Sequence, residues 1–136
     1  MKISDDAIKE IASELELGLI CHYHKKTGEI ESHPDMDHPD VESELWLDVV
    51  DKIEADPEHY ICIEPMRSNE AFKIMESFAL TVDDEDFQNR IYRALSRRGP
   101  FRNFNELIHE SAYRQDWFDH KTKYYQDWVR RQVEFE

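Results

Sequence analysis

The apolar pattern at the start of the chain predicts a helix followed by a β-hairpin. Residues 4–15 open with a capping serine and two acids, and their apolar side chains then recur three and four positions apart, as on one helix face. Gly18 supplies the end of this helix. Residues 17–24 and 29–33 flank a Lys-Lys-Thr-Gly turn, which is typical of two antiparallel strands.

The pattern beyond the hairpin predicts a second helix, a third strand and then helices only. Residues 33–40 form a proline-broken loop, after which Asp40 caps a helix that runs through Ile53. Residues 60–63 form a short strand that joins the hairpin. The later segments carry apolar residues at helical spacing, namely Ala71, Phe72, Met75, Phe78, Ala79 and Val82, then Phe87, Ile91, Ala94 and Leu95, then Phe104, Leu107 and Ile108, then Tyr113, Trp117, Tyr124 and Trp128.

This order of elements predicts an α+β fold. We expect a small antiparallel three-stranded sheet with N-terminal helices, followed by a C-terminal helical bundle, because strands and helices are segregated along the chain. A length of 136 residues, of which 40% are hydrophobic and only 3 are glycine, suits a single domain over residues 1–136. Within it, residues 1–65 form the half that contains the strands, and residues 66–136 form an all-helical half.

The net charge of −14 is concentrated in the first half. Residues 1–64 hold 18 acidic and 5 basic side chains, a net charge of −13, whereas residues 65–136 are close to neutral at −1. Such a chain is repelled by nucleic acids and anionic membranes unless a local basic face overcomes the repulsion. The sequence shows neither a signal peptide nor an apolar run long enough to span a membrane, and its two cysteines form no disulfide framework. These features predict a cytoplasmic protein.

Histidines in the hairpin are the first candidate for chemistry. His22 and His24 lie on one face of a strand, because side chains alternate with period two. His38 lies in the following loop, and these three residues are the candidate ligands of a divalent metal ion such as Zn²⁺, with further donors nearby at His33, Asp35, Asp37 and Asp40. The alternative is structural: a half-exposed hairpin needs one polar face, and its loop needs proline and aspartate for turns.

A basic stretch near residue 95 is the second candidate. Arg90, Arg93 and Arg97 share one helix face, and the remaining candidate binding residues are Arg98, Arg102 and Trp117. Cations interleaved with aromatic rings can bind phosphates or the acidic surface of a protein. The arginines also suit the C-terminal end of a helix that begins with four acids, where the helix dipole favours them.

The same region carries a resemblance to a known family. The carrying residues are Ile-Met-Glu-Ser-Phe at 74–78, Arg-Ile-Tyr-Arg-Ala-Leu at 90–95, Arg-Gly-Pro-Phe-Arg-Asn-Phe at 98–104, and Trp-Phe at 117–118. Over residues 64–130 the chain resembles uncharacterised protein family 0158, whereas residues 1–58 match more loosely and leave the histidines outside the best match. The resemblance implies a small cytoplasmic bacterial protein of α+β type and implies no reaction, cofactor or partner.

The Pro-Phe-Arg-Asn-Phe block within that resemblance has two interpretations. Phe101 and Phe104 can wedge between the neighbouring helices, with Arg98 and Arg102 capping carbonyls at the turn. Alternatively, the turn forms a small anion-binding notch.

Catalytic motifs do not appear in the sequence. There is no Gly-x-Ser-x-Gly elbow, P-loop or dinucleotide turn, and both cysteines lie in apolar strands that favour inert thiols. The leading hypothesis is therefore a non-enzymatic binding, adaptor or regulatory protein. It would bind a protein partner, or a second copy as a homodimer, through its arginine and aromatic helical surface. The alternatives are a metal-binding protein or metal-dependent enzyme that uses the histidines, and a nucleic-acid-binding protein, which the net charge opposes.

Overall fold

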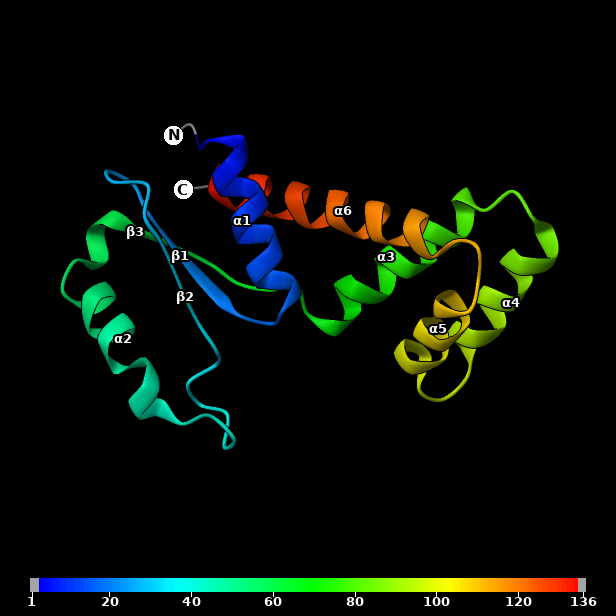
Figure 1. Cartoon of the computed structure of the whole chain (residues 1–136), viewed down its shortest axis with the longest axis horizontal. Helices are drawn as coiled ribbons and strands as arrows, with labels where there is room; N and C mark the ends of the chain where they lie inside the picture. The colour runs from blue at the N-terminus through cyan, green and yellow to red at the C-terminus, as the bar shows by residue number, and fades with distance from the viewer. Residues whose placement is uncertain (1–2, 135–136) are drawn as a thin grey trace. The chain divides into compact units, whose positions relative to one another are not determined.

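The computed structural model describes residues 3–134 and confirms the α+β class. Its described part holds a three-stranded antiparallel sheet and six α-helices (Figure 1). The chain forms two compact units: unit 1 comprises Met1–Pro65 with Tyr125–Glu136, and unit 2 comprises Met66–Tyr124. The last turns of the final helix thus belong to the unit that contains the sheet. That residues 1–136 behave as a single domain stays a prediction.

Unit 1 begins with helix α1, Asp5–Glu16, as the sequence predicts. The Ala7 backbone N–H donates to Ser4 Oγ at 3.2 Å, which satisfies one of the amides that a helix start leaves unpaired. The helix ends at Leu17, and Gly18 follows with φ of 86°, a left-handed conformation that glycine adopts without a steric penalty.

The sheet consists of β1 (Ile20–His24), β2 (Ile30–His33) and β3 (Tyr60–Ile63) in the order β2-β1-β3. Both pairs are antiparallel, so the predicted hairpin and the joining third strand are confirmed. The first strand starts at Ile20 and not at residue 17, because the residues before it complete the end of α1.

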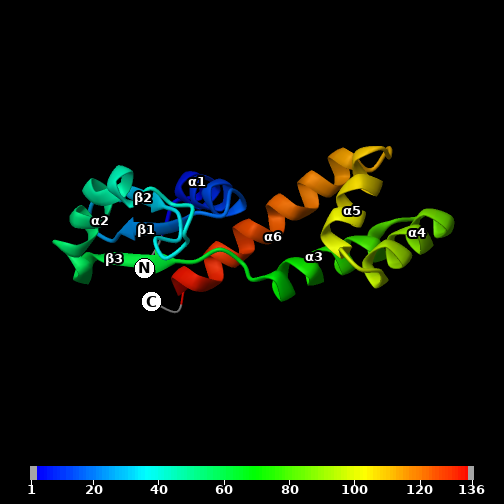
Figure 2. The ribbon, with the colours of Figure 1, turned by 90° about the horizontal axis from the view of Figure 1, so that it is seen from below.

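One face of the sheet forms the core of unit 1. Alternate residues of β1 and β3 point to this face, where α1 and the C-terminal turns of α6 (Arg114–Glu134) cover them (Figures 1 and 2). The buried residues of this cluster are Ile8, Ile11, Ala12, Leu15, Cys21, Tyr23, Ile61, Ile63, Val129 and Val133. The opposite face of the sheet therefore carries the intervening, more polar residues.

The second predicted helix starts later than expected. A 3₁₀ turn at Ser43–Trp46 leads into α2, Leu47–Glu54, and Asp40 does not cap either one. Instead the Asp40 backbone N–H donates to His38 Nδ1 at 3.2 Å, which keeps residue 40 in a turn of the preceding loop. Lys52 of α2 then binds the carboxylates of Glu29 and Glu31 beside β2, at 2.6 and 2.7 Å.

Unit 2 is helical throughout, as predicted (Figure 2). It consists of α3 (Ser68–Thr81), α4 (Glu85–Ser96), α5 (Pro100–His109) and the N-terminal part of α6. Its buried residues are Ile74, Met75, Phe78, Ala79, Val82, Phe87, Ile91, Leu95, Phe104, Ile108 and Trp117. Within residues 3–134, none of the helices combines the length and apolar character needed to cross a membrane.

Candidate functional sites

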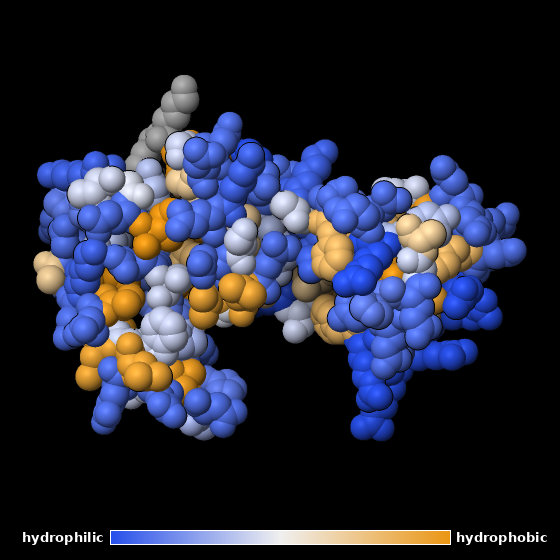
Figure 3. Space-filling view, in the orientation of Figure 1, coloured by the Kyte–Doolittle hydropathy of each residue, from blue (hydrophilic) through white to orange (hydrophobic). Residues whose placement is uncertain are grey.

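A groove between α4 and α5 contains three of the predicted arginines. We call it the arginine groove; it has a volume of about 510 Å³, and it is lined by Arg90, Arg93, Ala94, Arg97, Asn103, Glu106, Leu107 and Glu110. Arg90 and Arg93 line it from α4, and Arg97 lines it from the position directly after that helix, because positions i, i+3 and i+7 lie on one side of a helix. The surface over α4 and α5 is mainly hydrophilic in Figure 3.

The cations of this groove are only partly engaged within the chain. The guanidinium carbon of Arg90 lies 5.7 Å from the centre of the Phe87 ring, a cation–π distance. Among residues 3–134, no carboxylate forms an ion pair with Arg93 or Arg97. On the opposite wall Glu106 accepts from Arg102 Nε at 3.3 Å. The groove therefore offers exposed cations on α4 and carboxylates on α5.

The turn between α4 and α5 is organised by Asn103. Its side-chain amide donates to the carbonyls of Ala94 and Arg98, at 3.1 and 3.0 Å, at the C-terminal end of α4. Asn103 thus does the carbonyl capping that the sequence suggests for Arg98 and Arg102. Helix α5 begins at Pro100, directly after Gly99 with φ of 73°, so Asn103 lies inside that helix.

The other three predicted binding residues lie outside the groove lining. Arg102 pairs with Glu106, and the carbonyl of Arg98 accepts from Asn103. Trp117 is only 7% exposed and packs edge-on against Phe104, with ring centres 4.7 Å apart. It belongs to the core of unit 2, so the exposed aromatic side chains of this unit are others, namely Tyr92, Phe101 and Phe118.

The polar face of the sheet is the second candidate site. By register and alternation, the face opposite the core carries side chains from all three strands, and we call it the histidine face; it comprises His22, His24, Glu31, His33, Tyr60 and Cys62. His22 lies opposite Glu31 on one side and Cys62 on the other. The strand register places His22 and His24 on the same face, as the sequence predicts.

His22 and His33 contact each other through their ring nitrogens. Their Nε2 atoms are 2.9 Å apart, and the rings stack with centres 5.0 Å apart. His33 Nδ1 lies 2.7 Å from the carbonyl oxygen of Pro34, which can only accept, so His33 carries its proton on Nδ1. His22 then donates from Nε2 to His33. Burial lowers the pKa of His22 below its ordinary value, and the adjacent His33 lowers it further.

His24 belongs to a different cluster, with Asp56 and His59. His24 Nε2 is 3.0 Å from Asp56 Oδ2, and His59 Nδ1 is 2.6 Å from Asp56 Oδ1. One donor atom from each of the three residues lies within 4.8 Å of the other two, so a metal could be held there. The hydrogen bonds from His24 and His59 lower the pKa of Asp56.

Asp56 and His59 are site residues that the sequence pattern did not predict. Antiparallel pairing of β3 with β1 sets Tyr60 opposite His24, which brings the residues just before β3 to the end of β1. The sequence predicts this third strand but does not predict that it pairs with β1. Knowledge of that pairing would have identified Asp56 and His59 as neighbours of His24.

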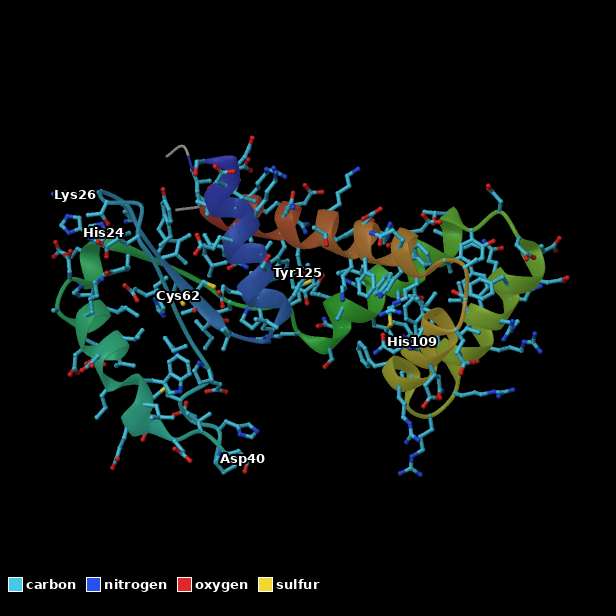
Figure 4. All side chains as sticks on the ribbon, viewed as in Figure 1. His24, Lys26, Asp40, Cys62, His109 and Tyr125 are labelled. Carbon is cyan, nitrogen blue, oxygen red and sulfur yellow. The ribbon has the colours of Figure 1, made fainter. Side chains whose placement is uncertain are left out.

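His38 does not join either group. Its Nδ1 lies 3.9 Å from Asp40 Oδ2 within the proline-broken loop. Figure 4 shows Asp40 of this loop well apart from His24 and Lys26 at the hairpin turn. The structure therefore does not bring His22, His24 and His38 together as one set of ligands.

Unit 2 contains a further histidine that the sequence pattern did not predict as a site residue. His120 on α6 lies 2.9 Å from Ser77 Oγ through Nε2, and its ring contacts those of Phe78 and Tyr124. Burial lowers its pKa. His120 could not be recognised as part of a site from the sequence, because its partner Ser77 is 43 positions away.

Comparison with known proteins gives one match. Residues 22–135 match the family described as Uncharacterised protein family (UPF0158). No curated protein sequence and no solved structure matches the chain significantly. The matched range begins at His22, so the family match extends beyond residues 64–130 and includes the histidines of the hairpin, for which the sequence predicts a looser match. The chain belongs to the UPF0158 family.

Proposed function

We propose that this chain is a non-enzymatic binding protein whose arginine groove receives an acidic segment of a protein partner. The observation that carries the proposal is the set of exposed cations on α4 and at its C-terminal end, of which Arg93 and Arg97 have no carboxylate partner among residues 3–134. A guanidinium binds a carboxylate through two parallel hydrogen bonds, so two adjacent arginines suit acidic side chains spaced along a helix or strand.

The opposite wall of the groove favours a protein over a polyanion. Glu106 and Glu110 line this wall, and they would repel a nucleic-acid backbone that follows the groove. The net charge of −14 adds a long-range repulsion of the same sign. A protein segment can place acids against α4 and polar or basic side chains against α5, and it can cover Leu107 with an apolar residue.

The expected energy is modest. An exposed ion pair contributes about 0.2–1 kcal/mol, so two pairs account for about 2–30-fold in affinity. Reversing both charges adds repulsion to this loss. Because the groove is open to solvent, binding should weaken as salt is added.

A peptide library with a matched pair of variants tests the proposal. Labelled amphipathic helical peptides with acidic faces are titrated into the full chain at low salt, and binding is followed by fluorescence anisotropy. Arg93→Glu with Arg97→Glu should weaken the best peptide at least about tenfold. The control, Arg98→Glu with Arg102→Glu, makes the same change of charge outside the groove lining and should retain most of the affinity.

Two results would refute the groove as a binding site. One is equal binding by wild type and the Arg93 and Arg97 variant, with circular dichroism showing both folded. The other is the absence of any acidic peptide that binds more tightly than its lysine-substituted counterpart.

Self-association is the form of this proposal in which the acidic segment belongs to a second copy. Residues 1–64 carry a net charge of −13 and could supply that segment. Sedimentation velocity should then show a dimer at low salt that dissociates at high salt and is absent in the Arg93 and Arg97 variant. A monomer at every salt concentration removes self-association and leaves a foreign partner.

A further inference from the structure

The two histidines that meet across β1 and β2 have the geometry of metal ligands, a feature independent of the arginine groove. His22 and His33 are both half-buried, and their Nε2 atoms point at one another at 2.9 Å. A single proton shared between the two Nε2 atoms makes this a hydrogen bond as long as at most one of the two rings is charged. A divalent cation between the rings satisfies both nitrogens at once.

The hydrogen bond on the far side of His33 prepares its Nε2 atom. Because Nδ1–H donates to the Pro34 carbonyl at 2.7 Å, the lone pair of a neutral His33 is on Nε2, directed at His22. Metal-binding histidines in proteins usually make this contact, in which the other ring nitrogen donates to a carbonyl or carboxylate that fixes the tautomer and the ring orientation.

The spacing requires only a small movement. Zn–N bonds of about 2.0–2.1 Å in a tetrahedral site separate two nitrogen ligands by about 3.3–3.4 Å. The Nε2 atoms must therefore move apart by about half an ångström from their 2.9 Å separation. His22 gives up its Nε2 proton and rebinds one at Nδ1, which leaves both Nε2 lone pairs on the ion.

We propose that His22 and His33 bind one divalent transition-metal ion, Zn²⁺ in the first place, between strands β1 and β2. Water completes the coordination. Two imidazole nitrogens select Zn²⁺, Cu²⁺ or Ni²⁺ over Mg²⁺ and Ca²⁺, which prefer oxygen ligands. Glu31 lies opposite His22 in the β1–β2 register and shares the Lys52 ammonium with Glu29, so these two carboxylates and one ammonium leave a net negative charge that favours a cation.

The neighbouring cluster of His24, Asp56 and His59 offers three donor atoms, yet its hydrogen bonds oppose a metal. His24 Nδ1 accepts the backbone N–H groups of Lys26 and Thr27, at 3.1 and 3.0 Å. A neutral His24 must then carry its proton on Nε2, which donates to Asp56. A metal on that atom would leave an imidazolate or break both turn contacts. This cluster is complete as a hydrogen-bond network.

Zinc titration of matched variants of the full chain tests the site. Isothermal titration with ZnCl₂ alone should show one ion per wild-type chain. His22→Gln and His33→Gln should each lose at least about tenfold in affinity, since each removes one of two protein ligands. His59→Gln removes a histidine of the other cluster and should keep the affinity within about twofold.

A direct readout of the ring nitrogens guards against indirect effects. In ¹⁵N NMR spectra of the histidine rings, zinc should move the proton of His22 from Nε2 to Nδ1 and leave His33 protonated on Nδ1. Circular dichroism confirms that each variant is folded. Absence of zinc binding by the wild type overturns the proposal. So does an equal loss in His59→Gln, or unchanged affinity in folded His22→Gln and His33→Gln.

Discussion

Replacing Phe104 by alanine should be among the most damaging single changes in unit 2. The Phe104 side chain is fully buried, and its ring packs edge-on against those of Trp117 and Phe78, with centres 4.7 and 6.4 Å away. An aromatic ring buries about 150–250 Å², which at ~25 cal/mol per Å² corresponds to about 4–6 kcal/mol. Alanine keeps the Cβ, and the structure relaxes partly, so we expect a loss of about 3–5 kcal/mol.

Phe101 provides the matched control. It is the same residue type on the same helix, but it is 37% exposed, and among residues 3–134 its ring has one ring neighbour, Phe72, with ring centres 6.5 Å apart. Phe101→Ala should therefore cost less than about 2 kcal/mol. The pair of variants tests whether the Pro-Phe-Arg-Asn-Phe block is a packing element anchored by Phe104.

Urea unfolding of the full chain, followed by circular dichroism and tryptophan fluorescence, measures both losses. With a slope of about 1–3 kcal/mol per M, Phe104→Ala should lower the midpoint by more than about 1 M. If the two variants differ by less than about 1 kcal/mol, the packing argument is wrong. That result would favour the alternative interpretation, in which the block forms an anion-binding notch.

Two further predictions concern the two cysteines and His120. Burial raises the pKa of the Cys21 thiol to about 12, whereas Cys62 is exposed. A thiol reagent at mildly alkaline pH should therefore modify only Cys62 in the native chain and both cysteines in urea. Equal rates of modification at the two thiols in the native chain would contradict this prediction. Burial lowers the pKa of His120 in the fold, so its contribution to stability is complete above the unfolded value near 6.5 and declines as pH falls below it. His120→Gln should flatten the fall in urea midpoint between neutral and mildly acidic pH, and an unchanged pH profile would refute the role of this ring.

Local signals in the sequence determined most of the elements of this fold. The serine cap and helical spacing of residues 4–15 define α1 because both depend only on neighbours within a turn. The alternation around the Lys-Lys-Thr-Gly turn defines the hairpin for the same reason. The predicted start of α2 at Asp40 was wrong. The Asp40 backbone N–H donates to His38 in the preceding loop, a hydrogen bond that competes with helix capping and that the spacing of apolar residues does not reveal.

The sites depended on contacts between residues far apart in the chain. The sequence placed Arg90, Arg93 and Arg97 on one face, since helix geometry alone requires it, but it did not show that α5 supplies Glu106 and Glu110 as the facing wall. The sequence likewise predicted Trp117 as a binding residue, whereas the Trp117 side chain packs against Phe104 and is buried.

The histidines show the same division. Strand alternation set His22 and His24 on one face, because successive side chains point to opposite faces of any strand. Register then separated them: β2 brings His33 to His22, and β3 brings Asp56 and His59 to His24. Strand order and register follow from burial of the whole core face, a property of the assembled sheet and not of any local segment, so only the tertiary structure decided which side chains meet.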